Sequence, residues 1–214
     1  MNMRRSNSLQ ALLAPLCLAI VQGCASSPST KPDTQASTER DESHLDIAIT
    51  REALIPGSID AVFAFIAAED VLPKVLTGYG PLPAVVSTSD HTAAWDQPGA
   101  ARVIHLADGS TVREQVTQHQ APDYFAYRVW DFGNPLIRAL AQGARGEWTF
   151  TATEQGSRTA TQVVWTYRFR AKNRLAALPL AGIVHIFWRG YMDVCLENSR
   201  RIMDATVDAT MPPV

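Results

Sequence analysis

The order of the periodic segments constrains the fold of this chain more than any other feature. From residue 84 to residue 170 the sequence reads as one strand-like segment after another, separated by turn-forming residues. From Gly182 onward the pattern changes to a helical stripe about six turns long. A run of strands followed by a long helix predicts an α+β domain with an antiparallel sheet. The stripe consists of Ile183, Phe187, Tyr191, Val194, Asn198 and Ile202.

The predicted domain covers residues 45–207, with 208–214 as a tail. A strand over 45–55 ends at Pro56-Gly57, and Ser58 is the expected N-cap of a short helix. A second short helix is expected over 69–76. The later strands are expected at 84–89, 92–95, 101–107, 110–118, 124–131, 146–153 and 159–170.

Asp108-Gly109 lies between two alternating segments and predicts a two-residue type I′ hairpin turn. Such a turn pairs Val103 with Glu114 and places His105 diagonally across from Glu114. Glu114 shares its parity with two valines, so its side chain is expected on the inner face of the sheet. Tyr127 belongs to the apolar parity of the next strand and is expected nearby.

The predicted cluster of Glu114, His105 and Tyr127 is the one arrangement in the sequence suited to acid–base chemistry. The alternative is structural, because a buried carboxylate needs a hydrogen-bonding or cationic partner and can anchor a sheet through it. The residues alone leave both interpretations open.

Aromatic residues dominate the inward parity of the last hairpin. Trp165, Tyr167 and Phe169 alternate along one strand, and Trp148 on the partner strand is expected opposite Trp165. With aromatic residues of the long helix they predict an apolar cavity of the kind that small hydrophobic ligands use. The expected cavity residues are Trp148, Trp165, Tyr167, Phe169, Phe187 and Tyr191.

The amino terminus has the features of an export signal. Arg4 and Arg5 precede an apolar stretch from Leu9 to Val21, which is too short to span a bilayer. Val21-Gln22-Gly23-Cys24 then resembles the lipobox of bacterial lipoproteins, apart from Gln22, where a small residue is usual. We therefore expect a signal peptide over 1–23, lipidation at Cys24 and a polar tether over 24–44. Ala25 is not Asp, which favours the outer membrane, facing the periplasm.

Composition excludes several classes of function. Removal of residues 1–23 leaves 17 basic and 21 acidic side chains, so a nucleic-acid partner is not expected. The five histidines show no metal-ligand spacing, and neither a metal nor a cofactor is predicted. Cys195 has no disulfide partner after maturation and is expected as a small buried hydrophobe. A basic run over 168–174 is either a solvated strand end or, beside a membrane, a contact for anionic headgroups.

Several segments carry a resemblance to a known superfamily. Residues 58–65 resemble the opening helix of SRPBCC (START-like) proteins, and 99–114 resemble the central hairpin of their polyketide cyclase/dehydrase branch. Residues 125–129 and 164–169 continue the similarity. The resemblance implies a helix-grip fold, in which a curved sheet wraps around a C-terminal helix and encloses a cavity.

Fold membership does not decide chemistry, so three functions stay open. The first is an envelope lipoprotein that binds a hydrophobic small molecule or lipid. The second is a polyketide cyclase or dehydratase that uses the inward Glu114. The third is a structural or interaction protein whose cavity is filled by its own side chains.

Overall fold

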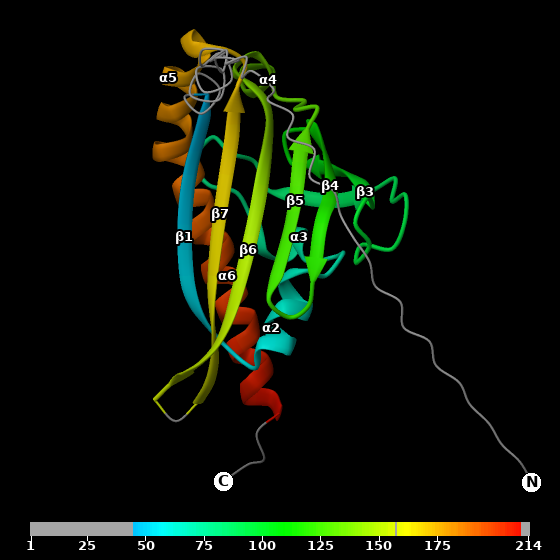
Figure 1. The fold of residues 1–214 in the computed structure, drawn as a ribbon, viewed down its shortest axis with the longest axis vertical. Coiled ribbons are helices and arrows are strands. Elements are labelled where there is room, and N and C mark those ends of the chain that lie inside the picture. Colours follow the sequence, from blue (N-terminus) through cyan, green and yellow to red (C-terminus); the bar gives the residue numbers. More distant parts are fainter. Residues whose placement is uncertain (1–44, 157, 211–214) are drawn as a thin grey trace, which may run out of the picture. The chain divides into compact units, whose positions relative to one another are not determined.

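The computed structural model describes residues 45–156 and 158–210. Within these residues a single antiparallel sheet has the strand order β1-β7-β6-β5-β4-β3-β2 (Figure 1). Its long strands, β1, β7 and β6, lie side by side, and the short strands form the other half. The strands are β1 (Asp46–Pro56), β2 (Val85–Ser89), β3 (Ala101–Leu106), β4 (Thr111–Gln120), β5 (Tyr124–Trp130), β6 (Ala141–Gln155) and β7 (Arg158–Ala171).

The helices lie at one face and at the ends of the sheet (Figure 1). One continuous helix at the carboxyl end passes along the inner face, and two short helices follow β1, so the predicted α+β helix-grip architecture is confirmed. The helices are α2 (Ile59–Ile66), α3 (Leu72–Val75), α4 (Pro135–Leu140), α5 (Arg174–Ile183), the π-helical turn η1 (Val184–Trp188) and α6 (Arg189–Thr210).

Local capping fixes where three helices begin. The Ser58 hydroxyl accepts a hydrogen bond from the Ala61 N–H at 3.3 Å, as the sequence predicts. Asn134 caps α4 and Asn173 caps α5 in the same way, each with its side-chain oxygen. Each cap satisfies backbone donors that the first turn of a helix leaves without a partner.

Two predicted elements, one strand and the last helix, need correction. The chain over 92–95 forms no strand; it is a loop that buries Trp95. The last helix begins at Arg174, eight residues before the predicted start at Gly182, because Asn173 provides a cap and Pro179 is tolerated inside the helix. It also continues to Thr210, past the predicted domain end at 207.

The buried stripe of the last helix is displaced by about one residue from the predicted one. Ile183, Val194 and Ile202 are only half-buried, whereas the side chains one position later pack into the core. The π-helical turn inserts an extra residue into the helical repeat from Val184 onward and rotates the inward face. Tyr191 is buried as predicted, and the other packed positions are Leu180, Val184, Met192, Cys195, Leu196, Ser199 and Met203.

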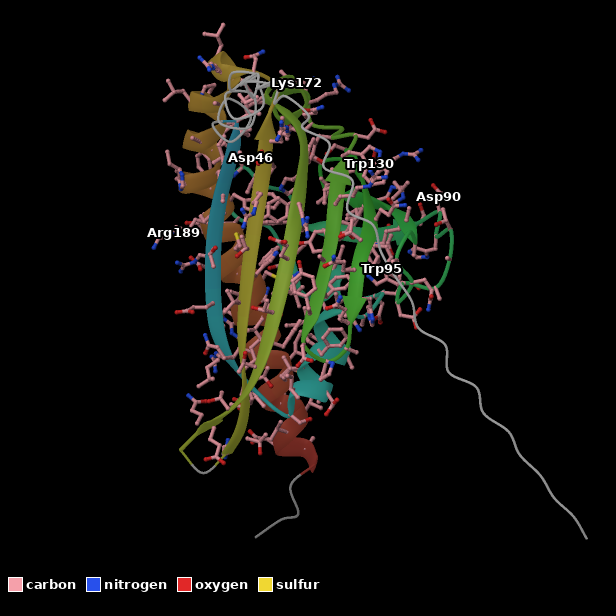
Figure 2. All side chains as sticks on the ribbon, viewed as in Figure 1. Asp46, Asp90, Trp95, Trp130, Lys172 and Arg189 are labelled. Carbon is pink, nitrogen blue, oxygen red and sulfur yellow. The ribbon has the colours of Figure 1, made fainter. Side chains whose placement is uncertain are left out.

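The two sequence-distant ends of the long strands meet at one edge of the domain. The Ala171 N–H donates to the Leu45 carbonyl at 2.8 Å, and Asp46 pairs in register with Arg170. Asp46 and Lys172 therefore lie at the same end of the sheet (Figure 2). The predicted signal peptide, the lipidated Cys24 and the tether over 24–44 fall outside the described residues.

Candidate ligand-binding site

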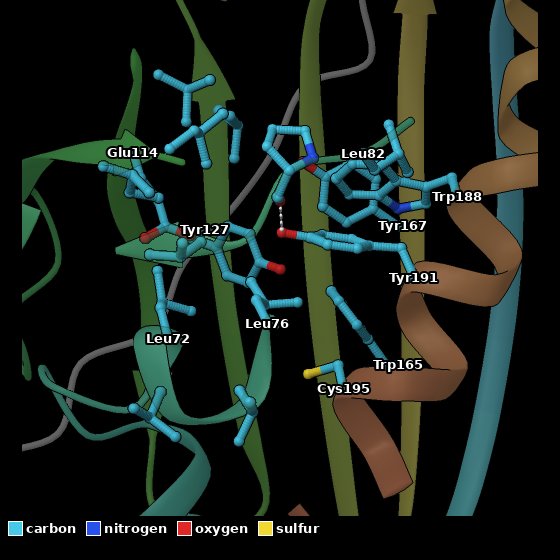
Figure 3. A pocket seen from close by; sticks show the side chains of 18 of the residues that line it. Leu72, Leu76, Leu82, Glu114, Tyr127, Trp165, Tyr167, Trp188, Tyr191 and Cys195 are labelled. Atoms are coloured by element: carbon cyan, nitrogen blue, oxygen red, sulfur yellow. Dashed lines mark hydrogen bonds between the residues drawn. The ribbon is translucent and has the colours of Figure 1, made fainter. Parts of the chain in front are cut away.

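A cavity of about 140 Å³ lies between the inner face of the sheet and the last helix (Figure 3). Its wall is mostly aromatic and aliphatic. Residues from β3 to β7, from α3 and α4, and from η1 and α6 all contribute to it. Of the six predicted cavity residues, five line it: Trp148, Trp165, Tyr167, Phe169 and Tyr191.

The predicted tryptophan pair is confirmed. Trp148 and Trp165 are register partners on β6 and β7, and their rings stack with centroids 4.3 Å apart and planes inclined by 10°. Both side chains are almost completely buried. The stack is the broad aromatic floor of the cavity, because β6 and β7 alternate strictly at this point.

Phe187 is the one predicted cavity residue that does not line the cavity, and Trp188 takes its place. Phe187 turns instead toward the loop after α3, where its ring lies beside Gly80. The cause is again the π-helical turn, which carries position 188 to the inner side. Trp188 packs against Tyr167 at 4.6 Å and Tyr191 at 5.2 Å between ring centroids.

Tyr127 lies on the inner face as predicted and lines the cavity. It sits directly opposite Gly146 on β6, and its ring occupies the space that a side chain there would fill. Gly146 in turn pairs with Tyr167. A glycine between two tyrosines on neighbouring strands lets the Tyr127 ring lie flat across the sheet.

Glu114 is buried on the inner face, and its partner is a residue that the sequence interpretation missed. Arg102 on β3 lies directly opposite in register, and its Nε donates a hydrogen bond to Oε2 at 2.8 Å while one Nη is in ion-pair contact with the same oxygen at 2.7 Å. The other Nη of Arg102 donates to the Glu69 carbonyl at 2.6 Å, and the guanidinium lies 3.7 Å from the Trp95 ring centroid. The buried guanidinium of Arg102 thus has a carboxylate, a backbone carbonyl and an aromatic ring as partners.

The predicted contact between His105 and Glu114 is wrong, because the hairpin register differs by one residue. Val103 pairs with Arg113 and His105 with Thr111, so His105 points to the opposite face. Its Nε2 hydrogen-bonds the Ser89 hydroxyl at 2.8 Å.

The shift arises in the hairpin turn itself. The Asp108 carboxylate accepts hydrogen bonds from both the backbone N–H and the hydroxyl of Ser110, at 3.0 and 2.7 Å. This favours a three-residue loop with only Gly109 in the left-handed region (φ 80°) over the two-residue type I′ turn. Glu114 still faces inward because the parity of its own strand is unchanged.

Burial controls the electrostatics of the cavity. It raises the pKa of the Tyr127 and Tyr167 phenols well above the ordinary value, so both stay neutral. Burial also raises the pKa of Glu114, against the opposing attraction of Arg102. The Cys195 thiol, confirmed as buried, has its pKa raised to about 12 by the same desolvation. Apart from the Arg102–Glu114 pair, the cavity therefore presents neutral groups.

One hydrogen-bond donor in the cavity wall has no protein acceptor. The indole Nε1 of Trp188 is buried and makes no hydrogen bond with any described residue, whereas the Trp165 indole lies within reach of the Tyr127 hydroxyl. Such orphan donors are rare in folded proteins, because leaving one unsatisfied costs about 1–3 kcal/mol. A ligand that offers an acceptor inside the cavity would remove this penalty.

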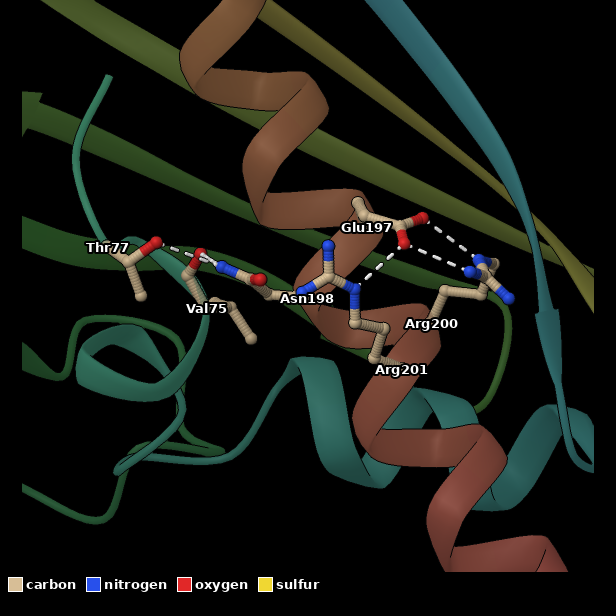
Figure 4. Close-up of polar contacts among 6 residues, drawn as sticks. All are labelled: Val75, Thr77, Glu197, Asn198, Arg200 and Arg201. Carbon is tan, nitrogen blue, oxygen red and sulfur yellow. Dashed lines mark hydrogen bonds and ion pairs between the residues drawn. The ribbon is translucent and has the colours of Figure 1, made fainter. Parts of the chain in front are cut away.

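One side of the cavity is closed by the loop after α3, which α6 holds in place. The Tyr191 hydroxyl donates to the Pro83 carbonyl at 3.0 Å (Figure 3). Farther along α6, the Asn198 amide donates to the Val75 carbonyl and to the Thr77 hydroxyl, each at 3.0 Å (Figure 4). Gly190 of α6 is covered closely by the Tyr79 ring, and any side chain at 190 would collide with it.

Within 45–156 and 158–210, no three His, Cys, Asp or Glu side chains are placed to share a metal ion. The polar groups that reach the cavity are suited to hydrogen bonding with an organic ligand.

The fold and the enclosed aromatic cavity together define an SRPBCC domain. Residues 46–204 match the family described as polyketide cyclase / dehydrase and lipid transport, and this chain belongs to that family. No curated protein matches the sequence.

Solved structures share the fold at low sequence identity. Major latex-like protein 151 from Panax ginseng is 9% identical with a TM-score of 0.56, over 74% of this chain and 98% of that one. A norcoclaurine synthase point mutant from Thalictrum flavum, in complex with a transition-state analogue, is 9% identical with a TM-score of 0.52. The match covers 75% of this chain and 96% of that one. A protein from Nitrosospira multiformis is 9% identical with a TM-score of 0.52, and the match covers 73% of this chain and 95% of that one. At this identity the likeness concerns the fold alone.

Proposed function

We propose that this domain binds a small, largely apolar molecule that carries a hydrogen-bond acceptor, without transforming it. The observation that carries the proposal is the buried indole donor of Trp188, which has no acceptor among the described residues and lies in the wall of a largely apolar cavity. Membership of a family described by lipid transport as well as by cyclase and dehydrase activity agrees with a binding role.

The size of the cavity limits the ligand. A volume of about 140 Å³ compares with engineered apolar cavities of about 150 Å³ that take up benzene. The cavity therefore fits a single ring or a short chain, whereas a full lipid would need the loop after α3 to move away from α6. The aromatic side chains fill part of the space, which is the feature that the filled-cavity alternative rests on.

The test compares two ligands of similar shape, acetophenone and ethylbenzene, by calorimetry or by ligand-observed NMR. We expect tighter binding of the ketone, because its oxygen can accept from an indole N–H. Trp188→Phe keeps an aromatic ring and removes the donor, so it should reduce the preference by about tenfold, the equivalent of a hydrogen bond worth about 1.4 kcal/mol.

Trp130→Phe is the matched control, since Trp130 lies on the outer face beside Arg128. It should leave the preference unchanged. Equal binding of the two ligands would refute the acceptor requirement, and no binding of either would favour the structural protein with a filled cavity.

The enzymatic alternative, a cyclase or dehydratase, rests on Glu114 alone. The carboxylate lines the cavity, but Arg102 engages it and His105 is on the other face. Glu114→Gln separates the two functions. We expect it to retain binding of the apolar probe with a modest loss of stability, whereas a stable variant that has lost turnover of a polyketide-like substrate would establish the enzyme.

We further propose that the chain is a lipoprotein of the bacterial cell envelope, anchored through Cys24 and located at the outer membrane. The support is the sequence pattern at residues 4–24. Metabolic labelling with a palmitate analogue should mark the wild-type chain and leave Cys24→Ala unlabelled. Equal labelling of both would exclude acylation at this residue.

A further inference from the structure

Large apolar side chains gather at the end of the domain formed by α4, α5 and η1. The exposed fractions are 89% for Leu175, 82% for Leu178, 64% for Ile186 and 57% for Leu136. Isolated exposed leucines are ordinary, but a group of this exposure on adjoining helices marks an interaction surface. We refer to these four residues as the apolar face.

The residues of the apolar face lie on adjoining helices. Leu175 and Leu178 are three residues apart on α5, and Ile186 lies two turns farther along the same helix, past Gly182, beside which a side chain would meet open space. Leu136 is on α4, whose last residue is tied to the start of α5 by a 2.9 Å hydrogen bond from the Lys172 N–H to the Leu140 carbonyl.

The segments that carry the apolar face have only positively charged side chains. Segments 132–141 and 171–192 together contain no Asp or Glu, although the whole chain has a formal net charge of −2. They carry four exposed basic residues, and Figure 2 shows two of them, Lys172 and Arg189, at this end of the molecule and along the last helix. The four are Arg138, Lys172, Arg174 and Arg189. Three acidic residues at the border are each in an ion pair: Asp46 with Arg170, Asp131 with Arg113 and Asp193 with Arg51.

The same helices contribute to the cavity wall. Ile137 and Asn134 of α4 and Trp188 of η1 line the cavity, and all three are only half-buried. The apolar face thus adjoins partly open cavity wall. The chain also enters the domain here, because Leu45 and Asp46 pair with the end of β7 beside Lys172.

We propose that the apolar face docks onto an anionic lipid bilayer, with its leucines and isoleucine in the interfacial region and Arg138, Lys172 and Arg189 at the headgroups. Apolar side chains ringed by Lys and Arg are the composition that interfacial helices use, and each basic side chain near an anionic surface adds a favourable electrostatic attraction.

Docking differs from spanning. The continuous helix Arg174–Ala209 is long and apolar enough to cross a membrane by length and composition alone. However, Leu180, Met192 and Met203 pack one side of it into the core of the domain. Only the outward side of this helix, which carries Leu175, Leu178 and Ile186, is available to lipid.

The test uses the full chain reconstituted into vesicles with and without phosphatidylglycerol. An environment-sensitive fluorophore is attached at Leu178→Cys, or at Glu154→Cys at the exposed far end of the β6–β7 hairpin as the matched control. The probe at 178 should shift to the blue in phosphatidylglycerol vesicles and be quenched by brominated lipid. The probe at 154 should do neither, whichever way the chain is anchored.

Variants separate the apolar from the electrostatic contribution. Leu175→Asp should abolish the shift at 178, and Lys172→Glu with Arg138→Glu should reduce it in phosphatidylglycerol vesicles. Identical signals at 178 and 154 would overturn the proposal. So would a blue shift at 178 without vesicles that grows with protein concentration, since this would show that a second copy of the chain covers the apolar face.

Discussion

The inner face of the sheet is built in two different ways. On β6 and β7 it consists of uncharged rings, with the Trp148–Trp165 stack at its centre. On β3 and β4 it is held by a buried ion pair between Arg102 and Glu114, under the Trp95 ring. The aromatic half gains free energy from burial at every residue, whereas the ion-pair half is stable only while both partners are present. The two halves should therefore respond differently to substitution.

The largest effect is expected in the ion-pair half. Arg102→Met leaves Glu114 buried without its partner and should lower the free energy of unfolding by about 3–5 kcal/mol. Urea unfolding followed by circular dichroism measures the loss. The double variant Arg102→Met/Glu114→Leu should recover most of it, because both charges are then gone. Losses that simply add in the double variant would show that the two residues are not coupled.

A somewhat smaller effect is expected in the aromatic half. Trp165→Ala should lower the free energy of unfolding by about 3 kcal/mol, near the low end for such a truncation, because the adjoining cavity lets neighbours relax. It should also enlarge the cavity and admit bulkier apolar probes. Trp130→Ala on the outer face is the control, with a loss near 1 kcal/mol. If both variants lose the same amount, the aromatic floor is not the core of this half.

Cys195 tests whether the two halves close tightly on α6. It lines the cavity, and the pKa of its thiol is raised to about 12, so at pH 8 only about one thiol in ten thousand is ionised. Alkylation in the folded protein should be at least about a hundredfold slower than in urea. Rapid alkylation of the folded protein would show that α6 separates from the sheet.

The smallest effect is expected on the outer side of α6. Hydrogen bonds from Arg200 and Arg201 lower the pKa of Glu197 to about 2 (Figure 4). A lowered carboxyl pKa stabilises the folded state above the unfolded value near 4.5, and this contribution is lost as pH falls toward 2. Because Glu197 is partly exposed, water screens the pair, and Glu197→Gln should lose only about 0.5 kcal/mol at pH 7. If the difference in unfolding free energy between the wild type and Glu197→Gln did not change with pH, the lowered pKa of Glu197 would not be its cause.

The sequence predicted correctly those features that depend on a single strand or on a single helix cap. The alternation of β7 placed Trp165, Tyr167 and Phe169 inward, and the parity of β4 placed Glu114 inward, because period-2 alternation is a property of each strand by itself. The Ser58 cap was equally local. These local predictions stay correct even when the pairing predicted for other strands is wrong.

The partners across strands were harder to foresee. Asp108-Gly109 indicated a two-residue turn, but the Asp108 side chain binds Ser110 and adds a residue to the loop. That single residue replaces His105 by Arg102 as the neighbour of Glu114. A three-residue loop pairs Arg102 with Glu114, and Arg102 faces inward because it shares the parity of the apolar Ile104.

The sequence by itself determined the class of fold, the inner and outer faces of the long strands and the presence of an aromatic core, because these depend on local periodicity. Tertiary structure decided what Glu114 does, which helix residue enters the cavity and where apolar residues remain exposed. The role of Glu114 depends on the hairpin register, and the helix residue in the cavity depends on one π-helical turn that exchanges Phe187 for Trp188. The exposed apolar residues depend on which side of α5 the sheet covers. Each is a choice between alternatives of similar local energy, and only the packing of distant segments separates them.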